Sequence, residues 1–234
     1  MPVLGEDAPA HASSFPTWEQ LFEMALTAYL QAHFLPKDAF AAFCNVSEER
    51  LSHLIAVGAV PQPTYTCEGG AIRSAVFGSI PISEDLVGEY FRTDCARWIR
   101  IADYAPPGSE RAAVVDVLLQ ELEGYMTAVL GDANAAHDKA QLLLPHFFNG
   151  TFGLCIADPS TGAGIARKEL LQEQLVALAS DTHTPLDARV DRQALLALID
   201  DYARASMPFS PAEYDRSSRK RWVDDLRREL GEKS

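Results

Sequence analysis

The stretch from Phe40 to Pro61, FAAFCNVSEERLSHLIAVGAVP, constrains the fold of this chain more than any other segment. Its apolar residues have the spacing of two short helices that share one small core. Asn45 lies at the junction, where it tolerates left-handed backbone, and Ser47 is a good N-cap for the second helix. Gly58 suits the C-terminal cap of that helix. The pattern therefore predicts a helix, a tight turn and a second helix.

The rest of the chain favours helices, with one clear hairpin. Gly69 and Gly70 separate two short segments rich in β-favouring residues, and a two-residue Gly-Gly loop suits a type I′ turn. Helical spacing predicts helices near residues 17–34, 36–44, 83–103, 109–130, 133–147, 163–180, 190–206 and 211–230. Residues 149–162 are mixed, with β-favouring residues followed by turn residues, and suggest one more extended segment. We expect a mostly α fold, in which an N-terminal helix-turn-helix-like module with a small β-hairpin wing precedes a multi-helix C-terminal domain.

Breaks in this pattern suggest how the chain is divided. Residues 1–14 look like a flexible tail, and the run Pro106-Pro107-Gly108 interrupts the helical segments. We therefore predict an N-terminal module over residues 15–105 and a helical domain over residues 108–234.

The composition favours a globular protein of the cytoplasm. The 234 residues are 47% hydrophobic with a formal net charge of −13, so a core can form beneath a surface that repels phosphate backbones. We see no apolar run long enough to span a bilayer and no signal-peptide pattern at the start. The four cysteines have long gaps and no C-x-x-C spacing, which favours reduced thiols over a zinc ribbon or a disulfide scaffold.

The register from Ala41 through Val46 to Gly58 resembles the N-terminal helix-turn-helix of MerR-type regulators and excisionases. With the hairpin, the resemblance covers residues 36–78. It implies a winged helix-turn-helix in which the second helix reads DNA.

The expected reading surface differs from that family. The MerR-type second helix typically carries an arginine and aromatic residues, where this chain has Ser52, His53 and Leu54. The helix starts with Glu48 and Glu49, and carboxylates do not supply the phosphate contacts that position a reading helix. We therefore expect the segment to be a scaffold and do not expect it to bind nucleic acid.

The candidate ligand-binding residues are reactive or polar side chains in segments that break the helical pattern, where function is often placed. They are Tyr65, Trp98, His146, Asn149, Cys155, Asp158, Arg167 and Lys168. The last three lie within the run IADPSTGAGIARKELL, whose glycines precede a helix with two cations in its first turn and could help to hold an anion. An ordinary capped turn explains the same run, because it lacks the third glycine of a dinucleotide fingerprint.

Two other patterns have plain explanations. His137, His146, Cys155 and Asp158 are metal-ligand types within 22 residues, but nine residues separate the histidines, so one straight helix would not aim both at one ion. We predict no metal site and identify no cofactor. The basic run RSSRKRW could contact an acidic partner or nucleic acid; we favour a solvated helix face, where it balances Asp224, Asp225 and Glu229.

The segments LIAVGAVPQPTY and FFNGTFGLCIADP, together with Tyr90, Phe91 and Trp98, resemble an uncharacterised bacterial family labelled natural-product-biosynthesis proteins of unknown function. That resemblance implies a cytoplasmic protein of secondary metabolism and assigns no catalytic residue. We therefore expect an enzyme or accessory protein that handles a small molecule. The alternatives are a ligand-sensing regulator that binds DNA through residues 36–78, and a protein-interaction module. Either a homodimer or a complex with another protein of the same pathway is compatible with the sequence.

The acidic face predicts the outcome of a gel shift. At low salt, where even non-specific binding to phosphates is strongest, we expect no shift of duplex DNA. A shift under these conditions would favour the regulator instead.

Overall fold

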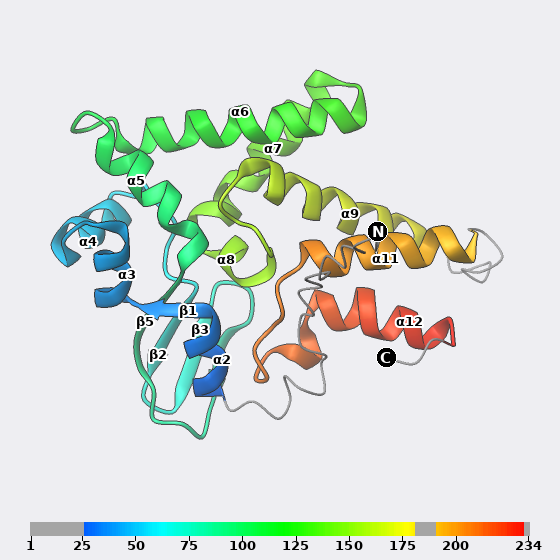
Figure 1. The fold of residues 1–234 in the computed structure, drawn as a ribbon, viewed down its shortest axis with the longest axis horizontal. Coiled ribbons are helices and arrows are strands. Elements are labelled where there is room, and N and C mark those ends of the chain that lie inside the picture. The colour runs from blue at the N-terminus through cyan, green and yellow to red at the C-terminus, as the bar shows by residue number, and fades with distance from the viewer. Residues whose placement is uncertain (1–25, 181–190, 232–234) are drawn as a thin grey trace, which may run out of the picture.

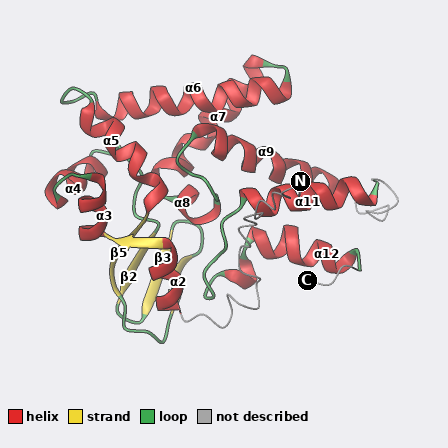
Figure 2. Ribbon diagram, viewed as in Figure 1, coloured by secondary structure: helices red, strands yellow, loops and turns green. Residues whose placement is uncertain are grey.

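The structure is a computed structural model that describes residues 26–180 and 191–231 (Figure 1). The predicted tail over residues 1–14 and the start of the predicted helix over 17–34 lie outside the described residues. The described chain is mostly helical with one small antiparallel sheet (Figure 2), which confirms the mostly α prediction.

The N-terminal helices follow the expected pattern. They comprise α2 (Leu26–His33), α3 (Lys37–Cys44) and α4 (Glu48–Ala56), with the short strand β1 (Phe34–Pro36) between α2 and α3. Asn45 ends α3 in the left-handed conformation at φ 62°, and the Ser47 side chain accepts a hydrogen bond from the Arg50 amide at 3.2 Å. Gly58 follows α4 with a positive φ of 65°. The turn, the cap and the stop predicted from the sequence are therefore confirmed.

The predicted hairpin is present, but it belongs to a larger sheet. The remaining strands are β2 (Tyr65–Glu68), β3 (Ala71–Ser74), β4 (Gly78–Pro81) and β5 (Val87–Arg92). All pairings are antiparallel, in the order β1-β5-β2-β3-β4. Gly69 and Gly70 form the turn between β2 and β3 with φ values of 53° and 74°, as a type I′ turn requires. The hairpin thus lies inside a sheet, and its strands are paired with β5 and β4.

The helix predicted over residues 83–103 is wrong in its first half. Residues Val87–Arg92 form β5, and helix begins only with a 3₁₀ turn (Thr93–Cys95) and α5 (Ala96–Tyr104). Tyr90 pairs with Tyr65, and the buried ring of Phe91 stacks on Phe40 at 4.8 Å between centroids. Valine, tyrosine and phenylalanine favour strands when neighbouring strands are available, and helical spacing does not report those neighbours.

The second half of the described chain is helical. It contains α6 (Glu110–Leu130), α7 (Ala133–Phe148), α8 (Thr151–Cys155), α9 (Gly162–Ser180) and α11 (Arg192–Ala205). The chain then forms a 3₁₀ turn (Tyr214–Arg216), a π-helix (Lys220–Asp225) and α12 (Leu226–Glu229). Figure 1 shows α6 and α7 along one side, and α9, α11 and α12 side by side at one end.

Two of the sequence predictions in this half are corrected. Residues 149–162 are not extended, because α8 occupies 151–155, and Ile156 makes only an isolated bridge to Ser206. Residues 211–230 do not form one continuous helix, because 3₁₀ and π turns interrupt it. Local sequence pattern does not distinguish 3₁₀ or π turns from α-helix.

Two hydrophobic clusters form the core. The larger one runs from Leu26 to Phe209 and includes side chains on both sides of the Pro106-Pro107-Gly108 break. The smaller one packs the end of α9 against α11, the π-helix and α12, around Tyr202 and Trp222. The division at residues 105–108 stays a prediction.

A buried carboxylate links the sheet to the C-terminal segment. Glu213 is almost completely buried and accepts hydrogen bonds from Tyr65 Oη at 2.5 Å, Ser74 Oγ at 2.7 Å and Ser210 Oγ at 2.8 Å. Burial raises the pKa of Glu213 above its ordinary value, although the three hydroxyl donors lower it. The protonated form is therefore favoured more strongly in the folded protein than in the unfolded chain.

This raised pKa makes a pH-dependent prediction. The stabilising contribution of Glu213 is fully present below its unfolded pKa of about 4.3 and is lost as the pH rises through its folded pKa. We expect the free energy of unfolding of wild type minus that of Glu213→Gln to be larger at about pH 5 than at about pH 8. Urea titrations measure both, with Glu229→Gln, an exposed carboxylate of α12, as control. A difference that stays constant or grows with pH would contradict the raised pKa.

Candidate functional site

A cavity of about 710 Å³ lies where the sheet side, the central helices and the C-terminal segment meet. Its lining residues are Val76, Phe77, His146, Thr151, Phe152, Leu154, Cys155, Lys168, Glu169, Gln172, Val176, Phe209, Asp215, Arg216, Ser217, Ser218, Arg221, Trp222 and Asp225. Phe209 belongs to the larger hydrophobic cluster and Trp222 to the smaller one. The lining combines apolar side chains with a larger number of polar and charged ones, and the volume is within the range that is typical of small-molecule sites.

A buried lysine lies at the wall of the cavity. The Lys168 side chain is 3% exposed, and its ammonium donates to Gln172 Oε1 at 2.7 Å and Glu169 Oε1 at 2.9 Å. It also donates to Cys155 Sγ at 3.8 Å. These three contacts use the three hydrogens of the ammonium. Lys168 therefore positions its neighbours and supplies a fixed positive charge.

The protonation states of this pair follow from burial and charge. Desolvation lowers the pKa of Lys168, but its interactions with Cys155, Glu169 and Tyr202, among them the hydrogen bond to Glu169, exceed that effect, so the pKa is raised. Burial raises the pKa of the Cys155 thiol despite the nearby ammonium. At neutral pH the wall thus carries a protonated lysine and a neutral thiol. A neutral thiol is a weak nucleophile, so the arrangement favours binding and electrostatic stabilisation over attack by Cys155.

Close packing places α9 where these contacts form. Gly162 starts the helix against α6, and a Cβ there would lie 2.7 Å from Glu121 Cβ and 2.8 Å from the Leu118 carbonyl oxygen. Only glycine permits this approach. Lys168 and Gln172 are four residues apart and therefore lie on the same face of α9.

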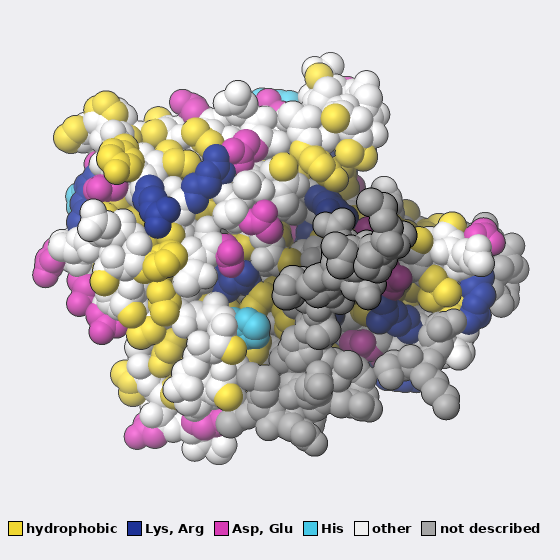
Figure 3. All heavy atoms as spheres, viewed as in Figure 1, with side chains coloured by type: hydrophobic (Ala, Val, Ile, Leu, Met, Phe, Trp, Pro, Cys, Tyr) yellow, Lys and Arg dark blue, Asp and Glu magenta, His cyan; other side chains and the backbone are white. Residues whose placement is uncertain are grey.

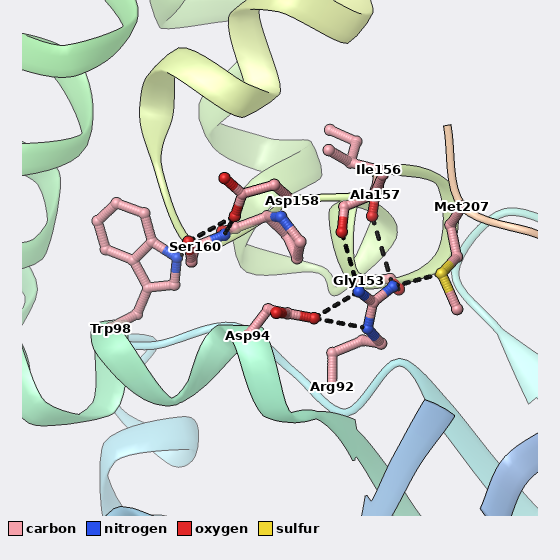
Figure 4. A network of polar contacts seen from close by, with 10 residues as sticks. Arg92, Asp94, Trp98, Gly153, Ile156, Ala157, Asp158, Ser160 and Met207 are labelled. Atoms are coloured by element: carbon pink, nitrogen blue, oxygen red, sulfur yellow. Dashed lines mark hydrogen bonds and ion pairs between the residues drawn. The ribbon is translucent and has the colours of Figure 1, made fainter. Parts of the chain in front are cut away.

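A second network holds α8, which carries Cys155 (Figure 4). The buried Arg92, at the end of β5, donates to the carbonyl oxygens of Gly153 at 3.5 Å, Ile156 at 3.4 Å and Ala157 at 3.1 Å. These carbonyls lie at the C-terminal end of α8, where helical partners are lacking. Arg92 also pairs with Asp94 and contacts Met207 Sδ at 2.7 Å.

The mouth of the cavity is formed by the π-helix and the turn before it. π-Helical turns are rare and often mark functional sites. The exposed Arg221 guanidinium lies 4.3 Å from the ring centroid of Trp222, and the exposed Arg216 guanidinium lies 5.1 Å from that of Phe77. The rim therefore combines positive charge with aromatic surface.

Three of the eight sequence-predicted site residues line this cavity, namely His146, Cys155 and Lys168. Of the other five, Tyr65 is buried and donates to Glu213, and Trp98 is buried and donates to the Pro159 carbonyl oxygen at 2.8 Å. These two side chains therefore belong to the hydrophobic core and do not line the cavity.

The remaining three candidates lie in turns or on the surface. Asn149 Oδ1 accepts from the Thr151 amide at 3.0 Å. Asp158 Oδ1 accepts from the Ser160 amide at 3.0 Å (Figure 4), and Thr161 Oγ1 accepts from the amide of Gly164, so the IADPSTG run is a capped turn. Arg167 pairs with Asp201 at 3.2 Å.

The sequence interpretation missed several residues of the cavity. Nothing in the sequence marks Gln172 as a site residue, because a polar residue on a long helix is common. The sequence does mark Arg216, Arg221 and Trp222, since they belong to the dense basic run near the C-terminus. Their interpretation as a solvated helix face was wrong for Trp222, which is buried in the smaller hydrophobic cluster.

Within residues 26–180 and 191–231, no group of three His, Cys, Asp or Glu side chains is placed to hold a metal ion. The same ranges contain no helix that combines the length and the apolar character needed to cross a bilayer.

The exposed face of α4 is acidic. Glu48, Glu49 and His53 are exposed, and acidic side chains lie along the edge that α3 and α4 form in Figure 3. Arg50, the one Lys or Arg of α4, pairs with Asp103 at 2.9 Å and Glu110 at 3.3 Å. Its charge is therefore already partnered within the protein.

Comparison with known proteins gives one match. The model of a family of unknown function, DUF6058, matches residues 117–231, just under half of the chain. All the cavity-lining residues except Val76 and Phe77 lie within that segment. No curated protein and no solved structure matches the chain.

The buried contacts of Lys168 predict a difference between two adjacent residues. Lys168→Met removes a buried ammonium and leaves Glu169 and Gln172 without its hydrogen bonds, so we expect the free energy of unfolding to fall by about 2 kcal/mol. Arg167→Met removes only a surface ion pair and should cost less than about 1 kcal/mol. Urea unfolding measures both, and equal losses would contradict the structural role of Lys168.

Proposed function

We propose that the chain is a cytoplasmic bacterial protein of secondary metabolism that handles a small molecule in the described cavity, as an enzyme or as an accessory protein. The single observation that carries this proposal is the cavity itself, about 710 Å³ in volume and lined mostly by residues of the second half of the chain. The secondary-metabolism part rests on the sequence resemblance alone.

The lining supports ligand binding more than catalysis by a nucleophile. Aromatic and aliphatic side chains supply apolar surface, and the polar groups gather on α9 and at the rim. The Lys168 ammonium and its partners stay in fixed positions because they are buried and hydrogen-bonded to one another. A preorganised wall of this kind reduces the cost of ordering side chains when a ligand binds.

The regulator alternative, with DNA bound through residues 36–78, is less well supported. The exposed carboxylates Glu48 and Glu49 would face the phosphates, and Arg50 is engaged with Asp103 and Glu110. Helix positioning on DNA depends on unpaired Lys and Arg side chains at the interface. We therefore propose that the α3–α4 pair is a scaffold.

A thermal-shift screen tests the cavity as a binding site. A ligand that binds only the folded protein raises its melting temperature by mass action. We expect library compounds that stabilise wild type to lose this effect in Val76→Trp, which places a larger side chain in the lining.

Val129→Trp is the matched control. Val76 is 49% exposed and Val129 is 50% exposed, but Val129 lies on α6 outside the cavity. Hits should persist in this control. If no compound stabilises wild type, or if hits persist equally in Val76→Trp, the proposal is wrong.

A further inference from the structure

The charges at the rim of the cavity are not balanced. Arg216 and Arg221 contact aromatic rings, and neither guanidinium makes an ion pair with any residue in the described part of the chain. Guanidinium groups bind carboxylates and similar oxyanions through paired N–H donors. Two such groups at one opening are therefore available to an anion.

The acids of the cavity do not compensate for them. Glu169 is paired with Lys168 at 2.9 Å, and Asp225 with Lys220 at 3.1 Å and Arg228 at 2.8 Å. Of the three lining acids, only Asp215 then remains to balance the two rim arginines. Among the lining side chains the rim thus keeps an excess of one positive charge, although the buried Glu213, outside the lining, also interacts electrostatically with Arg216.

A neutral donor lies deeper in the cavity wall. The amide oxygen of Gln172 accepts from Lys168 Nζ at 2.7 Å and from Tyr202 Oη at 3.2 Å. Because both partners are donors, the amide is oriented with its oxygen toward them. The Nε2 group has no partner among residues 26–180 and 191–231, so it is left to donate to a bound molecule.

The apolar part of the lining indicates the body of that molecule. The rings of Phe77 and Phe209 meet edge to face with centroids 6.0 Å apart, and Trp222 lies on the side of the smaller hydrophobic cluster. Both arginines rest on rings of this set. An apolar group packed against these rings would bring an attached acid group near the guanidiniums.

We propose that the ligand of this cavity is an organic acid, with an aromatic or other apolar body and a carboxylate recognised by Arg216 and Arg221. The Gln172 Nε2 group donates a hydrogen bond to a second polar atom of the same molecule. Lys168 is a positioning residue, because it orients Gln172. This inference rests on the proposed function, since it specifies the chemistry of the same site.

Matched probe pairs test the acid group. The probes are 2-naphthoate, 3-phenylpropanoate and octanoate, each compared with its primary amide by isothermal titration calorimetry. We expect at least one acid to bind wild type about tenfold or more tightly than its amide, as a charge-assisted pair allows. The Arg216→Gln/Arg221→Gln double variant should abolish this preference. Arg73→Gln, at an exposed arginine of β3 outside the cavity, should retain it.

Gln172→Glu gives an independent arm. It keeps an oxygen acceptor for Lys168 and Tyr202 but replaces the amide donor by a carboxylate, so acid binding should weaken about tenfold or more. An unchanged affinity for the acid would overturn the role of Gln172.

The outcomes separate this inference from the proposed function. If acids and amides bind equally, or amides bind better, and Val76→Trp abolishes both, the cavity is a binding site but the organic-acid inference is wrong. If no probe binds, or binding persists in Val76→Trp, both proposals fail.

Discussion

The arrangement of the candidate site depends on the contacts that the Arg92 guanidinium makes. Arg92 lies at the end of β5, and besides Asp94 its acceptors are carbonyl oxygens at and just after the C-terminal end of α8 and the sulfur of Met207. A helix terminus without helical partners needs such donors when it is buried. One side chain from the sheet therefore stabilises the short helix that carries Cys155, and with it one wall of the cavity. An unpaired charge at this depth would cost several kcal/mol, so Arg92 and its acceptors hold each other in place.

Glu213 makes a similar link with a carboxyl group. It lies in the segment after α11 and accepts hydrogen bonds from Tyr65 and Ser74 of the sheet. Together Arg92 and Glu213 attach the C-terminal segment to strands more than a hundred residues earlier. The cavity lies beside this attachment, between the two hydrophobic clusters. Its shape is therefore set by contacts between distant segments, while its chemistry comes mainly from α9 and the π-helix.

Local patterns predicted the helices well where capping and apolar spacing agree. The α3–α4 turn is the clearest case, because Asn45, Ser47 and Gly58 each meet a local backbone requirement. Residues 87–92 show the limit. The spacing of their apolar residues is compatible with a helix. In the structure these residues pair with β1 and β2, and Phe91 is buried. A single stretch of sequence does not show which partners the rest of the chain will provide.

The candidate site shows the same division. Cys155 and Lys168 were identified from the sequence as reactive types near a break in the helical pattern, and the structure brings them together. Asn149, Asp158 and Arg167 had the same local signal, but their side chains cap turns or pair at the surface. Arg216, Arg221 and Trp222 reach the cavity only because the last segment packs against α9 and α11.

By itself the sequence determined the mostly helical character of the chain, its acidic charge, the α3–α4 turn and the Gly69-Gly70 hairpin, because each depends on composition or on neighbours within a few residues. The tertiary structure alone decided the five-stranded sheet, the cavity and the set of side chains that line it. Those features depend on which distant segments pack together, and the free energy of that packing is a property of the whole chain.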